Sequence, residues 1–298
     1  MIDDVTLARR ARVLAANIEP CIGQVYFSPE CHAEYERLGF TGSRGEIDGV
    51  ALPDPVAYFT SRGSLMGQVA PQVVAAAFAV FNPEVVVPCV EAGWGLTDAA
   101  TIFAARRRGA VAQLARVLGE HPDGIERAVG LLEKAVAPLT VEGRPLFAGL
   151  RSQWDDPADL LTRFFHLGDE LREYRGDAHT AAWTSAGLDA VEIGFLTELF
   201  IGLPLRSYIR SRAWSDAALD AGLERLRARG WLEGDAFTPA GRAAREDIEW
   251  HTDRQLRPTV EALGDQFDGL ITLIGAWGTA MRDAGGYLRS PQQLGPKR

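Results

Sequence analysis

The stretch that decides the fold is LRSYIRSRAWSDAALDAGLERLRARGWLEGDAFTPAGRAAREDIEWHTD, residues 205–253. An apolar stripe at helical spacing predicts a helix in its first half, formed by Leu219, Leu223 and Leu226. Arg229 places a cation in the last turn of this helix, and Gly230 follows directly. A glycine at this place supplies the backbone conformation that commonly ends a helix. The helix is therefore expected to end at Arg229.

The second half of this stretch predicts a hairpin and another helix. Apolar and polar residues alternate from Trp231 to Phe237 around the pair Gly234–Asp235, a pattern typical of two short strands with a tight turn. Thr238 and Pro239 then supply an N-cap and a first helical residue for a helix that continues to about Arg254. The predicted order is helix, hairpin, helix.

This order resembles the MarR-type winged helix. The resemblance is carried by LERLRARGWL, residues 223–232, followed by FTPAGRAAREDIE, residues 237–249. It implies that the first turns of the helix ending at Arg229 would face the major groove of DNA. On that interpretation the DNA-binding residues would be Ser215, Arg225 and Arg227.

The residues at the expected DNA-facing positions do not suit DNA. Those turns hold Ser215, Asp216, Ala217, Ala218, Asp220 and Ala221. Alanine has no group that reads a base edge, and aspartate is repelled by the phosphates that normally dominate affinity. The tip of the wing carries Glu233 and Asp235 where such regulators usually present a cation. We therefore expect a winged helix kept as a scaffold, with Arg225, Arg227 and Arg229 explained as well by a solvated face as by phosphate contacts.

Composition limits the class of protein. The 298 residues are 47% hydrophobic and 24% charged, which is typical of a globular protein with a substantial core. The net charge of −9 argues against a general nucleic-acid or anionic-membrane surface. Three cysteines without a CxxC pair predict neither a disulfide framework nor a thiolate metal site, which favours the cytoplasm. No leader-like start and no apolar run long enough to span a membrane is seen.

Helical patterns fill the rest of the chain and predict an all-α fold. We expect a helical domain of residues 1–202 and a second domain of residues 203–298, which holds the winged helix and a C-terminal helix. The connection Gly202–Pro204 is too short for an independent linker. The Gly-rich segment 41–52 is interpreted as a connection, which leaves the wing as the one two-stranded ribbon, and the polar tail 290–298 is expected to be disordered. Gly176–Asp177 is interpreted as a break between two helices.

The whole chain also resembles an actinobacterial group described as a helix-turn-helix family. The resemblance lies in YFTSRG at 58–63, FNP at 81–83, Gly93–Trp94 with Thr97–Asp98, and RGDAH at 175–179. Arginine is plentiful and lysine scarce, as in proteins from GC-rich genomes. The group has no settled activity, so the resemblance implies a fold and no chemistry.

Charged residues are densest around position 170. His166 and Glu170 would share one helix face, as would Asp169 and Glu173. Paired metal sites in bundles need Glu-x-x-His on two helices, and the sequence has no such motif, so we expect no metal and interpret these acids as a solvated face. Asp177 is expected either to cap the helix that follows it or to act in catalysis.

One candidate site follows from charged residues in apolar or small-residue segments. We predict a pocket inside the helical domain, near its junction with the winged helix. Its catalytic groups would be His179 as general acid or base, Asp177 as its orienting carboxylate, and Arg62 as the stabiliser of an anionic group. Its ligand-binding residues would be Tyr58, Asn82, Trp94, Arg175 and Trp183. The alternative interpretation has Arg62 paired with a carboxylate and His179 bonded within the core.

These observations favour a cytoplasmic small-molecule-binding protein on a winged-helix scaffold that does not read DNA. A cofactor-free enzyme of specialised metabolism is included in this hypothesis, and catalysis itself stays open. The alternative is a ligand-responsive MarR-like regulator that binds DNA. No phosphate-binding loop, dinucleotide fingerprint or nucleophile elbow is present, so no cofactor is expected. A homodimer also stays open.

Overall fold

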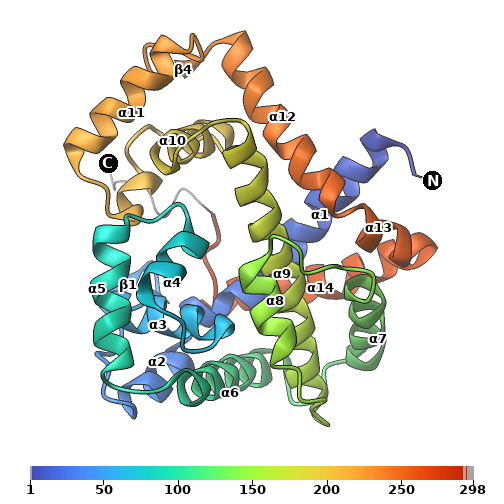
Figure 1. The fold of residues 1–298 in the computed structure, drawn as a ribbon. Coiled ribbons are helices and arrows are strands. Elements are labelled where there is room, and N and C mark those ends of the chain that lie inside the picture. Colours follow the sequence, from blue (N-terminus) through green and yellow to red (C-terminus); the bar gives the residue numbers. More distant parts are fainter. Residues whose placement is uncertain (1, 291–292, 294–298) are drawn as a thin grey trace.

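The computed structural model describes residues 2–290 and 293 and is mostly helical (Figure 1). Most of the polar tail expected to be disordered therefore lies outside the described residues. The α-helices are α1 (Asp4–Ile22), α2 (Pro29–Glu36), α3 (Pro55–Gly63), α4 (Pro71–Phe78), α5 (Pro83–Trp94), α6 (Ala99–Leu118), α7 (Ile125–Val136), α8 (Pro145–Ser152), α9 (Leu160–Ser185), α10 (Ala190–Phe200), α11 (Asp216–Ala228), α12 (Pro239–Gln255), α13 (Arg257–Leu263) and α14 (Phe267–Asp283). Short 3₁₀ turns are η1 (Gly23–Tyr26), η2 (Ser64–Met66), η3 (Tyr208–Arg212) and η4 (Gly264–Gln266). The all-α class is confirmed.

Two small hairpins complete the described fold. Strands β3 (Leu232–Glu233) and β4 (Ala236–Phe237) form the predicted wing, with Leu232 opposite Phe237. Strands β1 (Glu46–Ile47) and β2 (Val50–Ala51) form a second hairpin, so the expectation of a single ribbon was wrong. Asp48 and Gly49 both have positive φ, 50° and 81°, as a tight two-residue hairpin turn requires.

The helix starts follow the proline and capping pattern of the sequence. Ser28, Asp54, Asn82 and Thr238 each precede a proline, and each side chain accepts a hydrogen bond from a backbone N–H of the first turn. Proline costs nothing at this position because its missing N–H would have no partner there. The predicted start of the helix after the wing is therefore confirmed.

Helix α9 is the central element and runs unbroken from Leu160 to Ser185. The predicted break at Gly176–Asp177 was wrong, since both residues lie inside the helix. Helices α1, α6, α7, α8 and α12 all pack against α9. The two glycines of α9, Gly168 and Gly176, are tolerated because this packing stabilises the helix beyond its local propensity.

The main core joins both ends of the chain. Helix α14 lies along α1 and also contacts α6 and α7, and α13 packs on α7 (Figure 1). Phe267, Leu270 and Ile274 of α14 are buried together with Leu14 and Ile18 of α1. The last helices of the stretch 203–298 thus complete the core of the helical domain.

The winged helix packs around a smaller core and contacts the preceding helices on several sides. Leu219, Leu223 and Leu226 of α11 pack with residues of α10 and with Leu232 and Ile248. Helix α12 contacts α9 and α1 on one side. On the other side the segment before α11 lies against the start of α5 (Figure 1), where the Asn82 amide donates to the Ala213 carbonyl at 3.0 Å. No helix in the described part of the chain is both long enough and apolar enough to cross a membrane.

Candidate functional site

A row of three carboxylates, one turn apart on α9, faces the centre of the helical domain. Asp169, Glu173 and Asp177 are 0%, 0% and 5% exposed. Glu170 beside them is also buried, so the expectation of a solvated charged face was wrong. Helical spacing shows which charged residues share a face of α9. It does not show whether neighbouring helices cover that face and supply arginines that pair with its carboxylates. Each member of the row has a partner on a different neighbouring element.

Asp169 pairs with Arg106 of α6. The distance from Nη1 of Arg106 to Oδ2 of Asp169 is 2.7 Å, and both side chains are within 1% of complete burial. The guanidinium also lies 5.3 Å from the Phe165 ring centroid. Burial alone would lower the pKa of Arg106, but Asp169 outweighs it and raises that pKa above its ordinary value. Arg106 therefore keeps its positive charge in the core.

Glu173 lies between two arginines. Arg62 of α3 donates from Nε and Nη2 to the two Glu173 oxygens at 3.1 and 2.7 Å, and Arg172 donates from Nη1 at 2.8 Å. Burial alone would raise the pKa of Glu173, but Arg62 and Arg172 outweigh it and hold this pKa at about 2. This contact agrees with the alternative interpretation of the sequence, in which Arg62 pairs with a carboxylate.

Asp177 caps a helix other than the one expected. Its Oδ2 accepts from the backbone N–H groups of Leu146 and Phe147, both at 3.1 Å, in the first turn of α8. Arg144, at the N-cap position of α8, provides no side-chain cap of its own. Burial raises the pKa of Asp177 to about 7, against the lowering effect of these N–H groups. The expected cap of a helix after residue 177 was wrong because no helix begins there.

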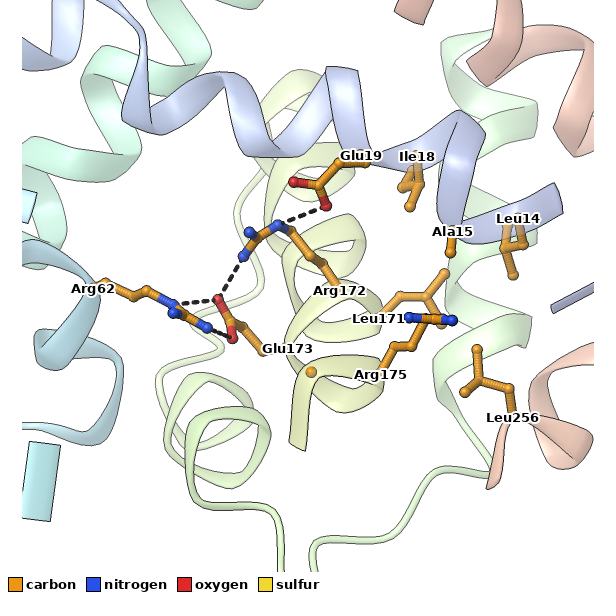
Figure 2. A pocket seen from close by; sticks show the side chains of 11 residues that line it. Leu14, Ala15, Ile18, Glu19, Arg62, Leu171, Arg172, Glu173, Arg175 and Leu256 are labelled. Carbon is orange, nitrogen blue, oxygen red and sulfur yellow. Dashed lines mark hydrogen bonds and ion pairs between the residues drawn. The ribbon is translucent and has the colours of Figure 1, made fainter. Parts of the chain in front are cut away.

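A cavity of about 180 Å³ lies between α1 and α9 beside Glu173 (Figure 2). Its apolar wall comes mainly from Leu14, Ile18, Leu171 and Leu256, and its polar lining consists of Glu19, Arg62, Arg172, Glu173 and Arg175. Figure 2 shows an unbroken chain of contacts from Arg62 through Glu173 and Arg172 to Glu19. Three cations and two carboxylates thus surround the space.

The arginines of this cavity keep N–H groups that no described residue accepts. Arg62 uses Nε and Nη2 for Glu173, which leaves Nη1. Arg172 uses Nε for Glu19 and Nη1 for Glu173 and the Tyr26 hydroxyl, which leaves Nη2. Arg175 donates from Nη2 to Glu249, and its buried Nε has no partner within the described residues. The lining therefore offers donors and excess positive charge.

His179 does not belong to the row of Asp169, Glu173 and Asp177 and instead faces α12. Its Nδ1 is 3.1 Å from the Thr252 hydroxyl and 3.8 Å from a Glu249 oxygen. About a fifth of the side chain is exposed, yet burial by the surrounding protein outweighs Glu249 and lowers the pKa of His179 to about 4. The imidazole is thus neutral at pH 7. Neither His179 nor Asp177 lines the cavity, whereas Arg62 and Arg175 do.

The four remaining predicted ligand residues lie in different parts of the fold. The Tyr58 ring is tilted by 59° against that of Tyr26, with the ring centroids 4.9 Å apart. The Trp94 indole donates to the Val69 carbonyl at 3.2 Å. Trp183 is buried in the separate core that joins α9 to the winged helix. Asn82 caps α5 and also contacts the segment before α11. None of these four residues lines the cavity.

The basic residues of α11 bond within the protein. Arg225 pairs with Asp189, and Arg229 donates to Glu192 at 3.0 Å and to the Gly187 carbonyl at 2.6 Å. Arg227 lies 3.5 Å from a carboxylate oxygen of Asp235. Ser215 accepts from the Ala218 N–H as the N-cap of α11.

Sequence reasoning missed Glu19 and Arg172, which line the cavity, and Glu249, which pairs with Arg175 beside it. Arg172 and Glu249 belong to charged helices with no local feature that separates buried from exposed positions. Glu19 follows the helical period of α1, and its nearness to α9 depends on tertiary packing. In the part of the chain that the structure describes, no group of three or more His, Cys, Asp or Glu side chains could hold a metal ion.

Comparison with protein families gives one match of nearly full length. A family described as a helix-turn-helix family matches residues 11–288, which include both the cavity and the winged helix. No curated protein matches the chain, and no solved structure does. With most of its length covered by this match, the chain belongs to the helix-turn-helix family.

Proposed function

We propose that this protein binds a small anionic molecule in the cavity between α1 and α9, and that its MarR-like winged helix serves as scaffold. The observation that carries the proposal is the excess of arginine around the cavity. Both lining carboxylates, Glu19 and Glu173, are already paired with arginines, while Arg175 keeps a buried Nε without a partner. A buried donor without a partner is costly, so a bound carboxylate or phosphate group would be favoured there.

The size of the cavity limits the ligand. A space of about 180 Å³ is smaller than the roughly 300–1,000 Å³ of ordinary ligand pockets. The apolar residues of α1 could contact a short hydrocarbon portion of the ligand, and the arginines could bind its acidic group. A small organic acid fits both walls.

The winged helix supports a scaffold role through its internal ion pairs. Residues 203–255 contain nine arginines and nine Asp or Glu residues, so this part carries no excess of positive charge. Arg225, Arg227 and Arg229 would have to leave Asp189, Asp235 and Glu192 to reach phosphates. DNA affinity depends on such cations releasing counterions from the phosphates.

The second candidate is a ligand-responsive regulator, and membership of a helix-turn-helix family favours it. Under this hypothesis Ser215, Arg225 and Arg227 would contact DNA. Binding would then weaken steeply between about 50 and 200 mM salt and would depend on sequence. Both candidates place the protein in the cytoplasm, in agreement with its three free cysteines.

Native mass spectrometry of protein purified from its own host tests the binding proposal. We expect an added mass of a small acid on the wild type, and its loss from Arg175→Met. Arg163→Met is the matched control, because Arg163 is a partly exposed, ion-paired arginine outside this cavity. A wild type without added mass, together with tight sequence-dependent binding in a genome-wide DNA selection, would overturn the proposal in favour of the regulator.

A further inference from the structure

Arg212 is a cation without an anionic partner. Its guanidinium carbon lies 4.4 Å from the ring centroid of Phe81 and 4.2 Å from that of Tyr208, so two aromatic rings enclose it. Among residues 2–290 and 293, no carboxylate pairs with this guanidinium and no group accepts a hydrogen bond from it. Contact with aromatic faces stabilises a cation but leaves its N–H groups free.

The backbone around Arg212 is held in place by the turn between α4 and α5. The Asn82 N–H donates to the Arg212 carbonyl at 2.9 Å, and the Asn82 amide donates to the Ala213 carbonyl at 3.0 Å. The Trp214 indole donates to the Val80 carbonyl, also at 3.0 Å. These bonds join the segment before the winged helix to the helical domain. They fix the backbone at Arg212, and the rings of Phe81 and Tyr208 position its guanidinium, which reduces the side-chain entropy that binding would cost.

Arg62 and Tyr58 face the same region. Arg62 lies over Phe78, 4.7 Å from its ring centroid, and the Tyr58 ring lies 5.8 Å from that of Phe81. Burial lowers the pKa of Arg212 to about 10. The nearby charge of Arg62 lowers this pKa further, whereas Tyr58 raises it. Arg212 still carries its charge at pH 7, at an electrostatic cost that an anion would remove.

We propose that Arg212, the free Nη1 of Arg62 and the hydroxyl of Tyr58 form a second site, which binds the oxyanion of a carboxylate or phosphate group. The donors come from α3 and from the segment that leads into the winged helix. A bound oxyanion therefore links the helical domain to the winged helix. Arg62 also lines the cavity between α1 and α9, but Arg212 and Tyr58 do not, so substitution of Arg212 tests this site separately from the function proposed above.

Thermal unfolding with anions tests this site. Sodium acetate and sodium phosphate are each compared with sodium chloride at equal ionic strength, for the wild type, Arg212→Met and Arg210→Met. Arg210 is the matched control, since it lies two residues away and pairs with the exposed Asp216. We expect an oxyanion to raise the midpoint of the wild type and of Arg210→Met above the chloride value, and to raise that of Arg212→Met less, because only general salt effects and the cavity between α1 and α9 remain in that variant.

The two anions separate the two sources of the oxyanion. A larger shift with acetate assigns the site to carboxylates, and a larger shift with phosphate assigns it to phosphoryl groups. Tyr58→Phe removes a single hydroxyl, and we expect it to reduce the shift while circular dichroism stays unchanged. Equal shifts in the wild type and Arg212→Met, or no shift with either anion, overturn the proposal.

Discussion

Arg62 holds Glu173 at two points, with Nε to Oε1 at 3.1 Å and Nη2 to Oε2 at 2.7 Å. The two residues are 111 positions apart and join α3 to α9. Because Glu173 is completely buried, water cannot solvate its carboxylate if Arg62 is removed, unless the surrounding structure rearranges. This contact positions the cation that both proposed sites use.

Loss of the Glu173 charge is expected to destabilise the protein strongly. Glu173→Gln leaves Arg62 and Arg172 without their buried carboxylate, a change that costs about 3–5 kcal/mol. Urea unfolding at pH 7 measures the difference. Glu133→Gln is the control, because Glu133 is 41% exposed in its pair with Arg163 and should cost under about 1 kcal/mol. Equal effects of the two substitutions would refute the structural role of Glu173.

Stability should depend on pH through Asp177. Its pKa is about 7 in the folded protein and ordinarily 3.8, so the folded state binds the extra proton between these values. The contribution of Asp177 is present below about pH 4 and is lost as the pH rises through 7. The free energy of unfolding of Asp177→Asn relative to wild type should therefore rise from pH 4 to pH 7, by on the order of 4 kcal/mol at most. A difference that stays flat with pH would contradict the raised pKa.

The buried pair of Arg106 and Asp169 offers a double-mutant test. Arg106→Met or Asp169→Leu alone leaves one buried charge, and each should cost about 3–5 kcal/mol. The double variant removes both charges and should be more stable than either single variant. Denaturant unfolding of all four proteins gives the coupling energy. Additive losses would mean that the two residues do not interact in the folded protein.

The crossing of α2 and α6 should depend on Gly109. A Cβ at this position would lie 2.5 Å from the Cα of Cys31, so the two helices would have to separate. Gly109→Ala is expected to cost at least about 1–3 kcal/mol, the range for overpacking. Gly130→Ala in α7 is the control, because a Cβ there meets nothing within 4 Å. We expect that variant to be neutral or more stable by up to about 1 kcal/mol, from helix propensity alone.

The parts of the fold that could be predicted are those with local causes. Thr238 and Pro239 begin α12 through their own hydroxyl and ring, and both are visible in the sequence. The turn at Asp48–Gly49 carried an equally local hairpin signal, which the interpretation of a Gly-rich connection overlooked. Local signals therefore existed for both hairpins.

The parts that could not be predicted depend on distant partners. Gly176–Asp177 carries a local break signal, but tertiary packing keeps α9 helical and directs Asp177 to the start of α8, 30 residues earlier. Arg212 gains its surroundings from Phe81, and no spacing along the chain relates the two residues. Arg62 was identified because small neighbours marked it as buried, and its partner Glu173 was then mistaken for a solvated residue.

The packing of α14 along α1 has a consequence for synthesis of the chain. Leu14 and Ile18 of α1 are made first, yet the α14 residues that cover them, Leu270 and Ile274, emerge from the ribosome some 250 residues later. At a rate of synthesis of about 5–20 residues per second, the apolar face of α1 stays uncovered for on the order of ten seconds or more before α14 is made. A nascent chain in that interval presents hydrophobic surface of the kind that chaperones bind. Folding of this core is therefore largely post-translational, and a premature stop before α14 yields a chain prone to aggregation.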